Sequence, residues 1–413
     1  MEGAAAKEST HIKCEWCGAG VHSVRHHLLQ HMCSAVPEAV KDNPETAFEE
    51  YRRLFPNAPT LSALAQEKVN QRQAQMAKEK ASMATTATAA EKITPIHGYI
   101  GTSEYRTELV AAHEILGLDA SKLCSATGGP VMITSFINRP FPEFVPEAKD
   151  DYVFSDIELI KDVLMMLEVG IPGYIWGHAG TGKTSLPSQI AALTGRPLIR
   201  SQHTASTEEA HITGQILARE GSTYFEPGLL ALAMRYGWVY LADEYDFAFP
   251  QILSLYQPVL EGEPLIIKEA TPEWRRVDRH KHFAFIGTGN TNGSGDETGL
   301  YQGTNVQNAA NFSRFGIVSW AQYMPPSDEV AMLVKIGIPP DIATNLVDFA
   351  LKIRAGYEGH EIAQPIGPRE LLQAARVGAM RQDFKLGLQK AFINKLPAAS
   401  MEAANNFAER IFG

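Results

Sequence analysis

The sequence predicts an α/β fold, a doubly wound parallel sheet followed by a small α-helical domain. Between residues 151 and 326, short β-rich runs alternate with apolar helical segments, a pattern typical of parallel strands joined by crossover helices. From residue 327 the β-rich runs stop, and stretches such as "PRELLQAARVGAM" indicate helices. Residues 1–36 hold three of the four cysteines and several histidines, which predicts a small zinc-finger-like element.

The amino-terminal element has the ligand spacing of a tetrahedral zinc site. Cys14 and Cys17 form a Cys-x2-Cys pair, and His27-x3-His31 follows on a predicted short helix. His26 could replace His27, because its spacing to His31 is equally permitted. Only nine residues separate Cys17 from His27, fewer than in a DNA-reading finger, and the flanking charges balance. We therefore expect a Zn²⁺ knuckle that docks a partner or substrate; a reduced cysteine pair with surface histidines is the alternative.

Two connecting regions follow this element. Residues 37–92 begin with aromatic positions and continue into "AQEKVNQRQAQMAKEKASMATTATAAEK", which favours helix but offers little apolar surface, so we expect a helical tether. Residues 93–150 are punctuated by proline and glycine. In "NRPFPEFVPEAKDDYVF" the prolines disfavour helix at the residues before them, so this lead-in is expected to be mostly extended.

The α/β domain, residues 151–326, contains five predicted strands. They are residues 172–177, 196–203, 237–244, 281–290 and 316–323. Because apolar helices lie between several of them, the strands should pair in parallel. Residues 327–413 show helical patterns only and predict a separate α-helical domain.

The loop after the first of these strands matches the pattern G-x4-G-K-[ST]. Its residues are Gly177, His178, Ala179, Gly180, Thr181, Gly182, Lys183 and Thr184. Glycines let backbone N–H groups face phosphate oxygens, Lys183 reaches the β- and γ-phosphates, and the Thr184 hydroxyl ligates Mg²⁺. A chance glycine-rich turn would not need the strand before it and the helix after it. Pro187 is one irregularity, expected to distort the first helical turn.

Further along the chain, "WVYLADE" gives an apolar strand that ends in Asp243 and Glu244. Beside a phosphate loop, an aspartate at this place holds Mg²⁺ through water, and the glutamate polarises the attacking water. Alone, the two carboxylates could be an ordinary exposed pair at a strand end. Together with the phosphate loop they predict hydrolysis of ATP with Mg²⁺ rather than binding alone.

Four further segments carry a family resemblance. They are "VPEAKDDYVF" (145–154), "HITGQI" (211–216), "FEPGLLALAMRYGWVYLADE" (225–244) and "FIGTGNTNGSGDETGLYQGT" (285–304). Over about residues 140–380 the chain resembles the MoxR branch of the AAA+ ATPases, and the last segment resembles the CobS family of cobaltochelatase ATPase subunits within that branch. The resemblance implies an AAA+ P-loop core and a carboxy-terminal α-helical lid.

The resemblance also implies roles for three residues. Asn290, at the end of "FAFIGTGN", matches the sensor-1 asparagine that orients the water beside Glu244. Arg314 in "SRF" matches the arginine finger, which acts on the nucleotide of the neighbouring subunit, and Arg369 in "IGPRE" matches the sensor-2 arginine of the lid. The simpler alternatives are a turn cap for Asn290, a surface ion pair for Arg314 and a first-turn helix residue for Arg369.

Between these residues lies the polar run "GTGNTNGSGDETGLYQGTNVQNAANFSRFG" (287–316), which by composition alone resembles a flexible linker. Its first residues are expected to end the fourth strand of the sheet, and its last to carry Arg314 to a neighbouring subunit. We therefore expect its middle to cross the subunit boundary and to link two active sites.

As a CobS-like protein, the chain would form a homo-hexameric ring that remodels a partner at the expense of ATP. Its expected partners are a von Willebrand A-type subunit and a large chelatase subunit that inserts Co²⁺ into a corrin ring in cobalamin biosynthesis. A MoxR-type chaperone that activates another metalloenzyme, also with a von Willebrand A partner, is the first alternative. A DNA-associated AAA+ ATPase is the second.

Composition limits these possibilities. The 413 residues are 45% hydrophobic and 20% charged, as in globular proteins, with a net charge of −10. That charge argues against direct nucleic-acid binding, which needs clustered cations. We expect no membrane association, because no apolar run approaches the roughly 18 residues that span a bilayer. The start of the chain lacks the apolar region of a signal peptide, and the few cysteines fit a reducing cytoplasm.

Overall fold

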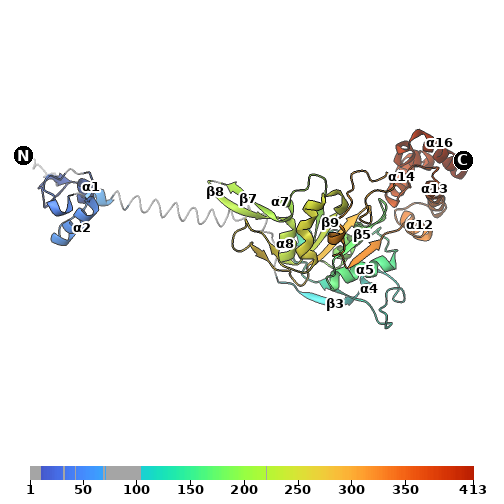
Figure 1. Cartoon of the computed structure of the whole chain (residues 1–413), viewed down its shortest axis with the longest axis horizontal. Coiled ribbons are helices and arrows are strands. Elements are labelled where there is room, and N and C mark those ends of the chain that lie inside the picture. The colour runs from blue at the N-terminus through green and yellow to red at the C-terminus, as the bar shows by residue number, and fades with distance from the viewer. Residues whose placement is uncertain (1–10, 31–32, 42, 68–69, 71–103, 220) are drawn as a thin grey trace, which may run out of the picture. The chain divides into compact units, whose positions relative to one another are not determined.

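The computed structural model describes residues 11–30, 33–41, 43–67, 70, 104–219 and 221–413. The chain divides into two compact units, residues 1–94 and residues 95–413 (Figure 1). Of the predicted tether, residues 71–92 lie outside the described part. The larger unit contains the predicted sheet and the predicted helical domain.

The amino-terminal unit is built from one small hairpin and short helices. Its elements are β1 (Ile12–Lys13), β2 (Gly20–Val21), α1 (Val24–Leu29), η1 (Glu38–Val40) and α2 (Pro44–Leu54). The two strands are antiparallel, and the Ser23 side chain caps α1 by accepting from the backbone N–H of His26. Tyr51 is fully buried, and its hydroxyl accepts a hydrogen bond from the backbone N–H of Glu15 at 3.0 Å. This contact joins α2 to the hairpin.

The larger unit is organised on a five-stranded parallel sheet. Its strands are β5 (Gly173–Trp176), β6 (Leu198–Gln202), β9 (Val239–Asp243), β12 (Ala284–Gly289) and β13 (Ile317–Trp320). Their order in space is β13-β5-β12-β9-β6, with every neighbouring pair parallel. All five strands lie inside the predicted segments, so the predicted doubly wound sheet is confirmed. β5, the first of these strands in the sequence, lies between β13 and β12, the last two. The strand order therefore reverses at β5. Open α/β sheets bind their ligands at the carboxyl ends of the strands at such a point of reversal.

Helices cover both faces of this sheet. The main ones are α5 (Ile157–Glu168), α6 (Ser185–Leu193) and α8 (Leu229–Tyr236), and shorter ones are α4 (Ala112–Leu116), α7 (Glu209–Ile212), η3 (Tyr245–Phe247), α9 (Pro250–Leu253), η4 (Ser254–Tyr256), α10 (Gln257–Leu260) and α11 (Ala309–Phe312). Successive strand residues point to opposite faces, so Tyr240 packs with α8 whereas Leu241 packs with α5 and α6. The inner strands β5, β9 and β12 are buried on both sides, as expected of a parallel sheet, whereas the edge strands β13 and β6 keep exposed positions.

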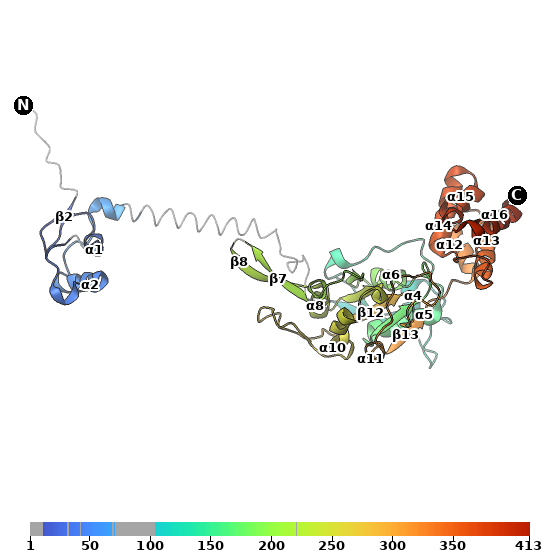
Figure 2. The same cartoon turned by 45° about the horizontal axis from the view of Figure 1, so that its top comes forward.

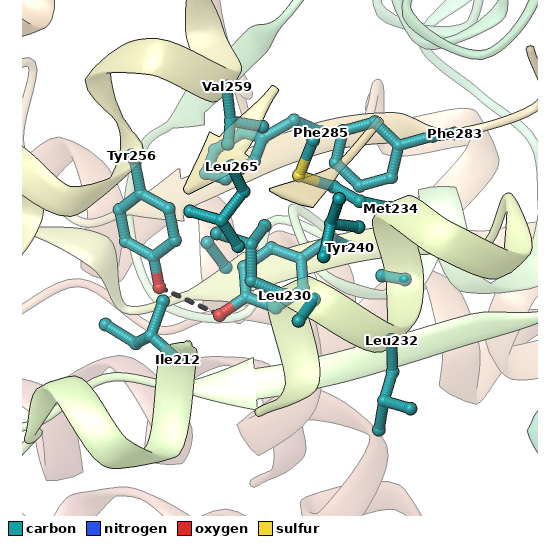
Figure 3. Packing of buried hydrophobic residues seen from close by; sticks show 14 of the residues in the cluster. Ile212, Leu230, Leu232, Met234, Tyr240, Tyr256, Val259, Leu265, Phe283 and Phe285 are labelled. Atoms are coloured by element: carbon teal, nitrogen blue, oxygen red, sulfur yellow. Dashed lines mark hydrogen bonds between the residues drawn. The ribbon is translucent and has the colours of Figure 1, made fainter. Parts of the chain in front are cut away.

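One apolar layer lies between α8 and the sheet (Figure 3). Tyr240 and Phe285 come from neighbouring strands, and Leu230 and Met234 come from α8. All four side chains are at most 1% exposed. The buried hydroxyl of Tyr240 is satisfied by the hydroxyl of Tyr256 at 2.8 Å, drawn as the dashed line.

Three antiparallel hairpins accompany the sheet. They are β3 (Thr107–Ala111) with β4 (Met132–Phe136), β7 (Gly214–Arg219) with β8 (Ser222–Pro227), and β10 (Leu265–Ile266) with β11 (Arg276–Val277). Two of these strands, β3 and β4, fall in the lead-in that we expected to be extended, and η2 (Pro142–Phe144) follows them. The β7–β8 hairpin projects beyond the sheet in both views of the chain (Figures 1 and 2).

Beyond the sheet the chain is helical, as predicted. The helices are α12 (Pro326–Lys335), α13 (Pro340–Glu358), α14 (Pro368–Arg381), α15 (Phe384–Ala391), η5 (Ile393–Lys395) and α16 (Ala398–Phe412) (Figure 2). They share a separate apolar core. Within it, the Arg354 guanidinium donates to both oxygens of the fully buried Glu329 at 2.9 and 2.7 Å and to the carbonyl of Ile366. The pair is therefore hydrogen-bonded as well as charge-matched, which buried ions require.

Candidate functional site

The predicted phosphate loop lies between β5 and α6, at the carboxyl edge of the sheet. Gly177 has φ +148°, and a Cβ there would meet the carbonyl oxygen of Ala321 at 2.3 Å, so only glycine fits. Gly180 and Gly182 also have positive φ values, which turn the backbone within the loop. Pro187 is the third residue of α6, where a backbone N–H has no partner inside the helix. The helix therefore runs without a break from Ser185 through Pro187 to Leu193.

Lys183 lies at the centre of the loop and is 9% exposed. Its Nζ donates to the carbonyls of Gly177 and His178 at 2.6 and 2.8 Å and to Oδ1 of Asn290 at 3.2 Å. Burial lowers the pKa of this ammonium group to about 8, although the nearby carboxylates act in the opposite direction. The predicted sensor-1 residue, Asn290, is thus in contact with the predicted phosphate-binding lysine.

Asp243 is the last residue of β9 and is nearly buried. One of its carboxylate oxygens accepts from the hydroxyl of Thr184 at 2.7 Å and from the hydroxyl of Thr288, and the other accepts from Nε of Arg200 at 2.7 Å. Burial alone would raise the pKa of Asp243, but these hydrogen bonds and the charge of Arg200 together hold it below its ordinary value. The carboxylate is therefore ionised at neutral pH.

Glu244 follows at the start of η3 with φ +53°. This left-handed conformation is strained for a residue with a side chain, at a cost of about 1–3 kcal/mol, and such strain gathers at functional sites. Its carboxylate accepts a hydrogen bond from Nε2 of Gln202 at 3.1 Å. The adjacent carboxylates of Asp243 and Glu244 are thus held by different neighbours on β6.

Asp246 supports the other half of the site. Its side chain is fully buried, and Oδ2 accepts from the backbone N–H groups of Asn290 and Thr291 and from the Thr291 hydroxyl, each at 2.9 Å. Its carbonyl accepts from the backbone N–H of Asn305 at 2.7 Å. Asp246 therefore fixes the residues after β12, Asn290 and Thr291, relative to η3, whose N-cap is Glu244.

These groups surround a cavity of about 560 Å³. Its wall includes the phosphate loop, both carboxylates and Asn290, together with the apolar residues Tyr152, Val153, Met324, Met332 and Leu372. Arg369, the second residue of α14, also lines the cavity. A wall that combines a lysine and other polar groups with apolar side chains suits a nucleotide, which has charged phosphates and a largely apolar base. The paired oxygens of Thr184 and Asp243 are hard donors of the kind that Mg²⁺ prefers.

The structure places Arg314 outside this group, two residues after α11. Its Nε donates to Oε1 of Glu261 at 2.7 Å, its Nη1 donates to the carbonyl of Ala310, and its side chain is 25% exposed. Arg314 is not part of the wall of the chain's own cavity. A surface ion pair is the alternative role predicted for Arg314 from the sequence, and Arg314 does form one with Glu261. This contact within one chain is compatible with a second role of Arg314 at the nucleotide of a neighbouring subunit.

The polar run 287–316 folds back onto the chain's own phosphate loop. The Tyr301 hydroxyl accepts from the backbone N–H of Ala179 at 3.1 Å and lies 2.9 Å from Nδ1 of His178. We had expected the middle of the run to cross a subunit boundary. Its ordered contacts tie it to the chain's own phosphate loop and exclude the linker interpretation, and the crossing of a subunit boundary stays a prediction.

Sequence reasoning missed Arg200, Gln202, Thr288 and Asp246. Gln202, Thr288 and Asp246 lie at or just after the carboxyl end of a strand, where parallel α/β sheets place their sites, and Arg200 lies two residues before that end in β6. A position near the carboxyl end of a strand was thus the sequence signal that could have identified these site residues. It could not be used without the strand order, because β6 is the neighbour of β9 only in space.

The amino-terminal unit holds a second cluster of polar groups. The ligand atoms of Cys14, Cys17, His27 and Cys33 all lie within 4.8 Å of one another, and Sγ of Cys17 is 3.2 Å from Nε2 of His27. A tetrahedral site with Zn–S bonds of about 2.3 Å separates its ligand atoms by about 3.8 Å, so the four groups fit zinc. Cys33 is the fourth member of this cluster among the described residues, and the predicted ligand His31 lies outside them. Sequence spacing favoured His31 because it lies four positions after His27, whereas Cys33 lies beyond the end of α1 at no such helical spacing.

The comparisons with known proteins agree with this geometry. Residues 174–310 match the family described as AAA domain (dynein-related subfamily). The aerobic cobaltochelatase subunit CobS of Sinorhizobium sp is 28% identical over 283 residues, 65% of this chain and 83% of CobS. Protein NorQ of Paracoccus denitrificans (strain Pd 1222) is 24% identical over 59% of this chain and 87% of NorQ. The gas vesicle ATPase GvpN of Ancylobacter aquaticus is 23% identical over 64% of this chain and 74% of GvpN.

The fold and the site thus define an AAA+ ATPase. Within this class the chain is similar to ATPases of the MoxR branch, CobS among them. ATP and Mg²⁺ follow from that assignment, and AAA+ ATPases generally assemble into rings. Among the described residues, no helix is long and apolar enough to cross a membrane.

Proposed function

We propose that this protein is the ring-forming motor subunit of a cobaltochelatase, and that it uses ATP to drive a partner that inserts Co²⁺ into a corrin ring. The observation that carries the proposal is the extent of the similarity, which spans 83% of CobS. In this proposal the chain supplies conformational work. The tetrapyrrole chemistry belongs to a large chelatase subunit, and a von Willebrand A-type subunit connects the two.

Within the ATP site, each residue has a proposed role. The phosphate loop and Lys183 bind the phosphates, and Thr184 and Asp243 hold Mg²⁺, which when bound neutralises phosphate charge. Glu244 polarises the attacking water from its strained position at the end of β9. Asn290 orients that water through its contact with Lys183, and Arg369 brings the helical lid to the phosphates.

We further propose that Arg314 acts in trans within a hexamer. The support is its position outside its own cavity, together with the match of "SRF" to the arginine finger. An arginine finger raises the rate of phosphoryl transfer about 10³–10⁵-fold. Arg314→Ala should therefore bind ATP normally and lose turnover by at least about a thousandfold.

Mixing two inactive variants tests the trans arrangement. A Glu244→Gln subunit retains Arg314 and can serve the intact site of an Arg314→Ala neighbour, so mixed rings should recover part of the ATPase activity. Co-purification through a tag on one variant verifies that the rings are mixed. If mixed rings recovered no ATPase activity, Arg314 would either have no role in hydrolysis or act on the nucleotide of its own subunit.

The partner is tested by reconstitution. Purified von Willebrand A-type and large chelatase subunits should stimulate the ATPase, and the three together should insert Co²⁺ into a corrin substrate only with hydrolysable ATP. Stimulation without cobalt insertion would favour a MoxR-type chaperone of another metalloenzyme. Stimulation by DNA alone would favour the DNA-associated alternative, which the net charge of −10 disfavours.

For the amino-terminal unit we propose one structural Zn²⁺ held by Cys14, Cys17, His27 and Cys33. The unit would present a docking surface for a partner, and the low cysteine usage supports a cytoplasmic location. Metal analysis of the full chain should give one zinc per chain, which His31→Ala retains and Cys33→Ser loses. The reverse pattern would restore His31 as the fourth ligand.

A further inference from the structure

Arg200 connects the edge strand of the sheet to the ATP site. It lies in the middle of β6, and the register of β6 with β9 places Gln202 beside Asp243, so the long Arg200 side chain extends along the strand to reach the carboxylate. Both Nε and Nη2 of its guanidinium donate to the same oxygen, Oδ2 of Asp243. The other oxygen accepts from the hydroxyls of Thr184 and Thr288. Four donors therefore use the four lone-pair positions of the carboxylate.

The two partners of this ion pair differ in their surroundings. The Asp243 side chain is 4% exposed, whereas the Arg200 side chain is 53% exposed and lines the nucleotide cavity. A buried carboxylate is costly without a cation beside it, but a half-exposed guanidinium loses little when it turns to water or to another anion. The Arg200 side chain can therefore move away from Asp243 without disturbing the core. The buried Asp243 carboxylate, in contrast, always needs a cation beside it.

We propose that Arg200 is an exchangeable counter-cation of Asp243. It holds the carboxylate while the site lacks Mg²⁺, and it releases Oδ2 to the hydration shell of the metal when Mg²⁺ and nucleotide bind together. The released guanidinium remains in the cavity beside the phosphates. Arg200 is then a positioning residue that prepares the metal site and prevents a bare carboxylate from repelling the nucleotide. The proposal rests on the ATP site described above and is independent of the partner.

A measurable consequence is the coupling between Mg²⁺ and nucleotide. With Arg200 present, the surroundings of Asp243 are close to neutral, so nucleotide without metal is tolerated and Mg²⁺ adds modestly to its affinity. Without Arg200, the negative charge of Asp243 repels the phosphates of a metal-free nucleotide. The same charge attracts Mg²⁺ more strongly, because no guanidinium competes with the metal for the carboxylate. The ratio of nucleotide affinity with Mg²⁺ to that without Mg²⁺ should therefore rise about tenfold, the scale of one charge-assisted hydrogen bond.

Arg376 offers a matched control. It lines the same cavity, carries the same charge and is also 53% exposed, but its guanidinium lies near Asp151, at 3.8 Å, rather than at Asp243. Its removal takes the same positive charge from the cavity. Arg376→Ala should therefore weaken nucleotide binding equally with and without Mg²⁺ and leave the ratio unchanged.

The experiment measures binding of a fluorescent ADP analogue to the full chain by anisotropy, in Mg²⁺-free buffer and at saturating Mg²⁺. The wild type, Arg200→Ala, Arg200→Lys and Arg376→Ala are compared after thermal unfolding has established equal stability. A raised ratio in Arg200→Ala, a smaller rise in Arg200→Lys and no change in Arg376→Ala are expected. An unchanged or lowered ratio in Arg200→Ala would overturn the proposal. Failure of the wild type to bind the analogue at all would instead contradict the ATP site itself.

Discussion

The two units of this chain are stabilised in opposite ways. The ATPase unit buries large apolar layers on both faces of its sheet, and its helical part has a core of its own. The buried cluster of the amino-terminal unit consists of Cys14, Val24, Leu28, Cys33 and Tyr51, and two of these are metal-ligand candidates. A domain of this size rarely has a sufficient apolar core without a metal or a disulfide. All four cysteines are free, so no disulfide supports the smaller unit.

The comparison shows where a ligand is needed for folding and where it is needed only for chemistry. In the ATPase unit the site polar groups satisfy one another: Lys183 contacts carbonyls and Asn290, and Asp243 contacts two hydroxyls and Arg200. Its fold should therefore persist without nucleotide. The thiols of the smaller unit lie close to one another, and in our proposal a Zn²⁺ ion between them is needed for folding.

The largest expected effect is on the smaller unit. Removing zinc from the full chain with a chelator, or replacing Cys14 with Ser, should unfold this unit, because a structural Zn²⁺ contributes about 10–16 kcal/mol in zinc-finger peptides. Hydrogen exchange resolved by peptide would show loss of protection over residues 11–67 and unchanged protection over the sheet. If residues 11–67 kept their protection without zinc, the two units would not differ as described.

A smaller effect is expected in the helical lid. Arg354→Ala leaves Glu329 buried and unpaired, so the free energy of unfolding should fall by about 3–5 kcal/mol. Thermal unfolding in the presence and absence of nucleotide measures it. Replacing both residues by apolar ones of similar size, Arg354→Met with Glu329→Leu, is the control and should restore most of the stability. A single variant as stable as wild type would mean that this pair is not an electrostatic unit.

The smallest effect is expected at the surface of the same lid. Lys385 and Glu409 form an exposed pair at 3.2 Å, and Lys385→Ala should change the free energy of unfolding by less than about 0.5 kcal/mol. Denaturant unfolding provides the measurement. A loss as large as that from the buried pair would show that burial does not govern the ion pairs of this unit.

Much of the ATPase fold was predictable because its signals are local. Four of the five strands are short, largely apolar runs, and the phosphate loop combines three positive-φ glycines with a lysine in one continuous segment. The roles of Arg200 and Gln202 were not predictable, because they depend on which strand lies beside β9. Cys33 was not chosen as a zinc ligand for a related reason: it lies beyond the end of α1, where helical periodicity gives no spacing to the other ligands. The contact of Tyr301 with the phosphate loop joins segments far apart in the chain.

Glu244→Gln tests most directly whether the chain is a hydrolase that uses Glu244 as its base. The substitution keeps the size of the side chain and its reach toward Gln202 while removing the carboxylate. Steady-state ATP turnover should fall by about 10²–10⁴-fold, the usual contribution of a general base, whereas binding of a fluorescent ATP analogue and the melting temperature should stay unchanged. A variant that binds and still hydrolyses ATP at the wild-type rate would contradict the mechanism proposed for this site.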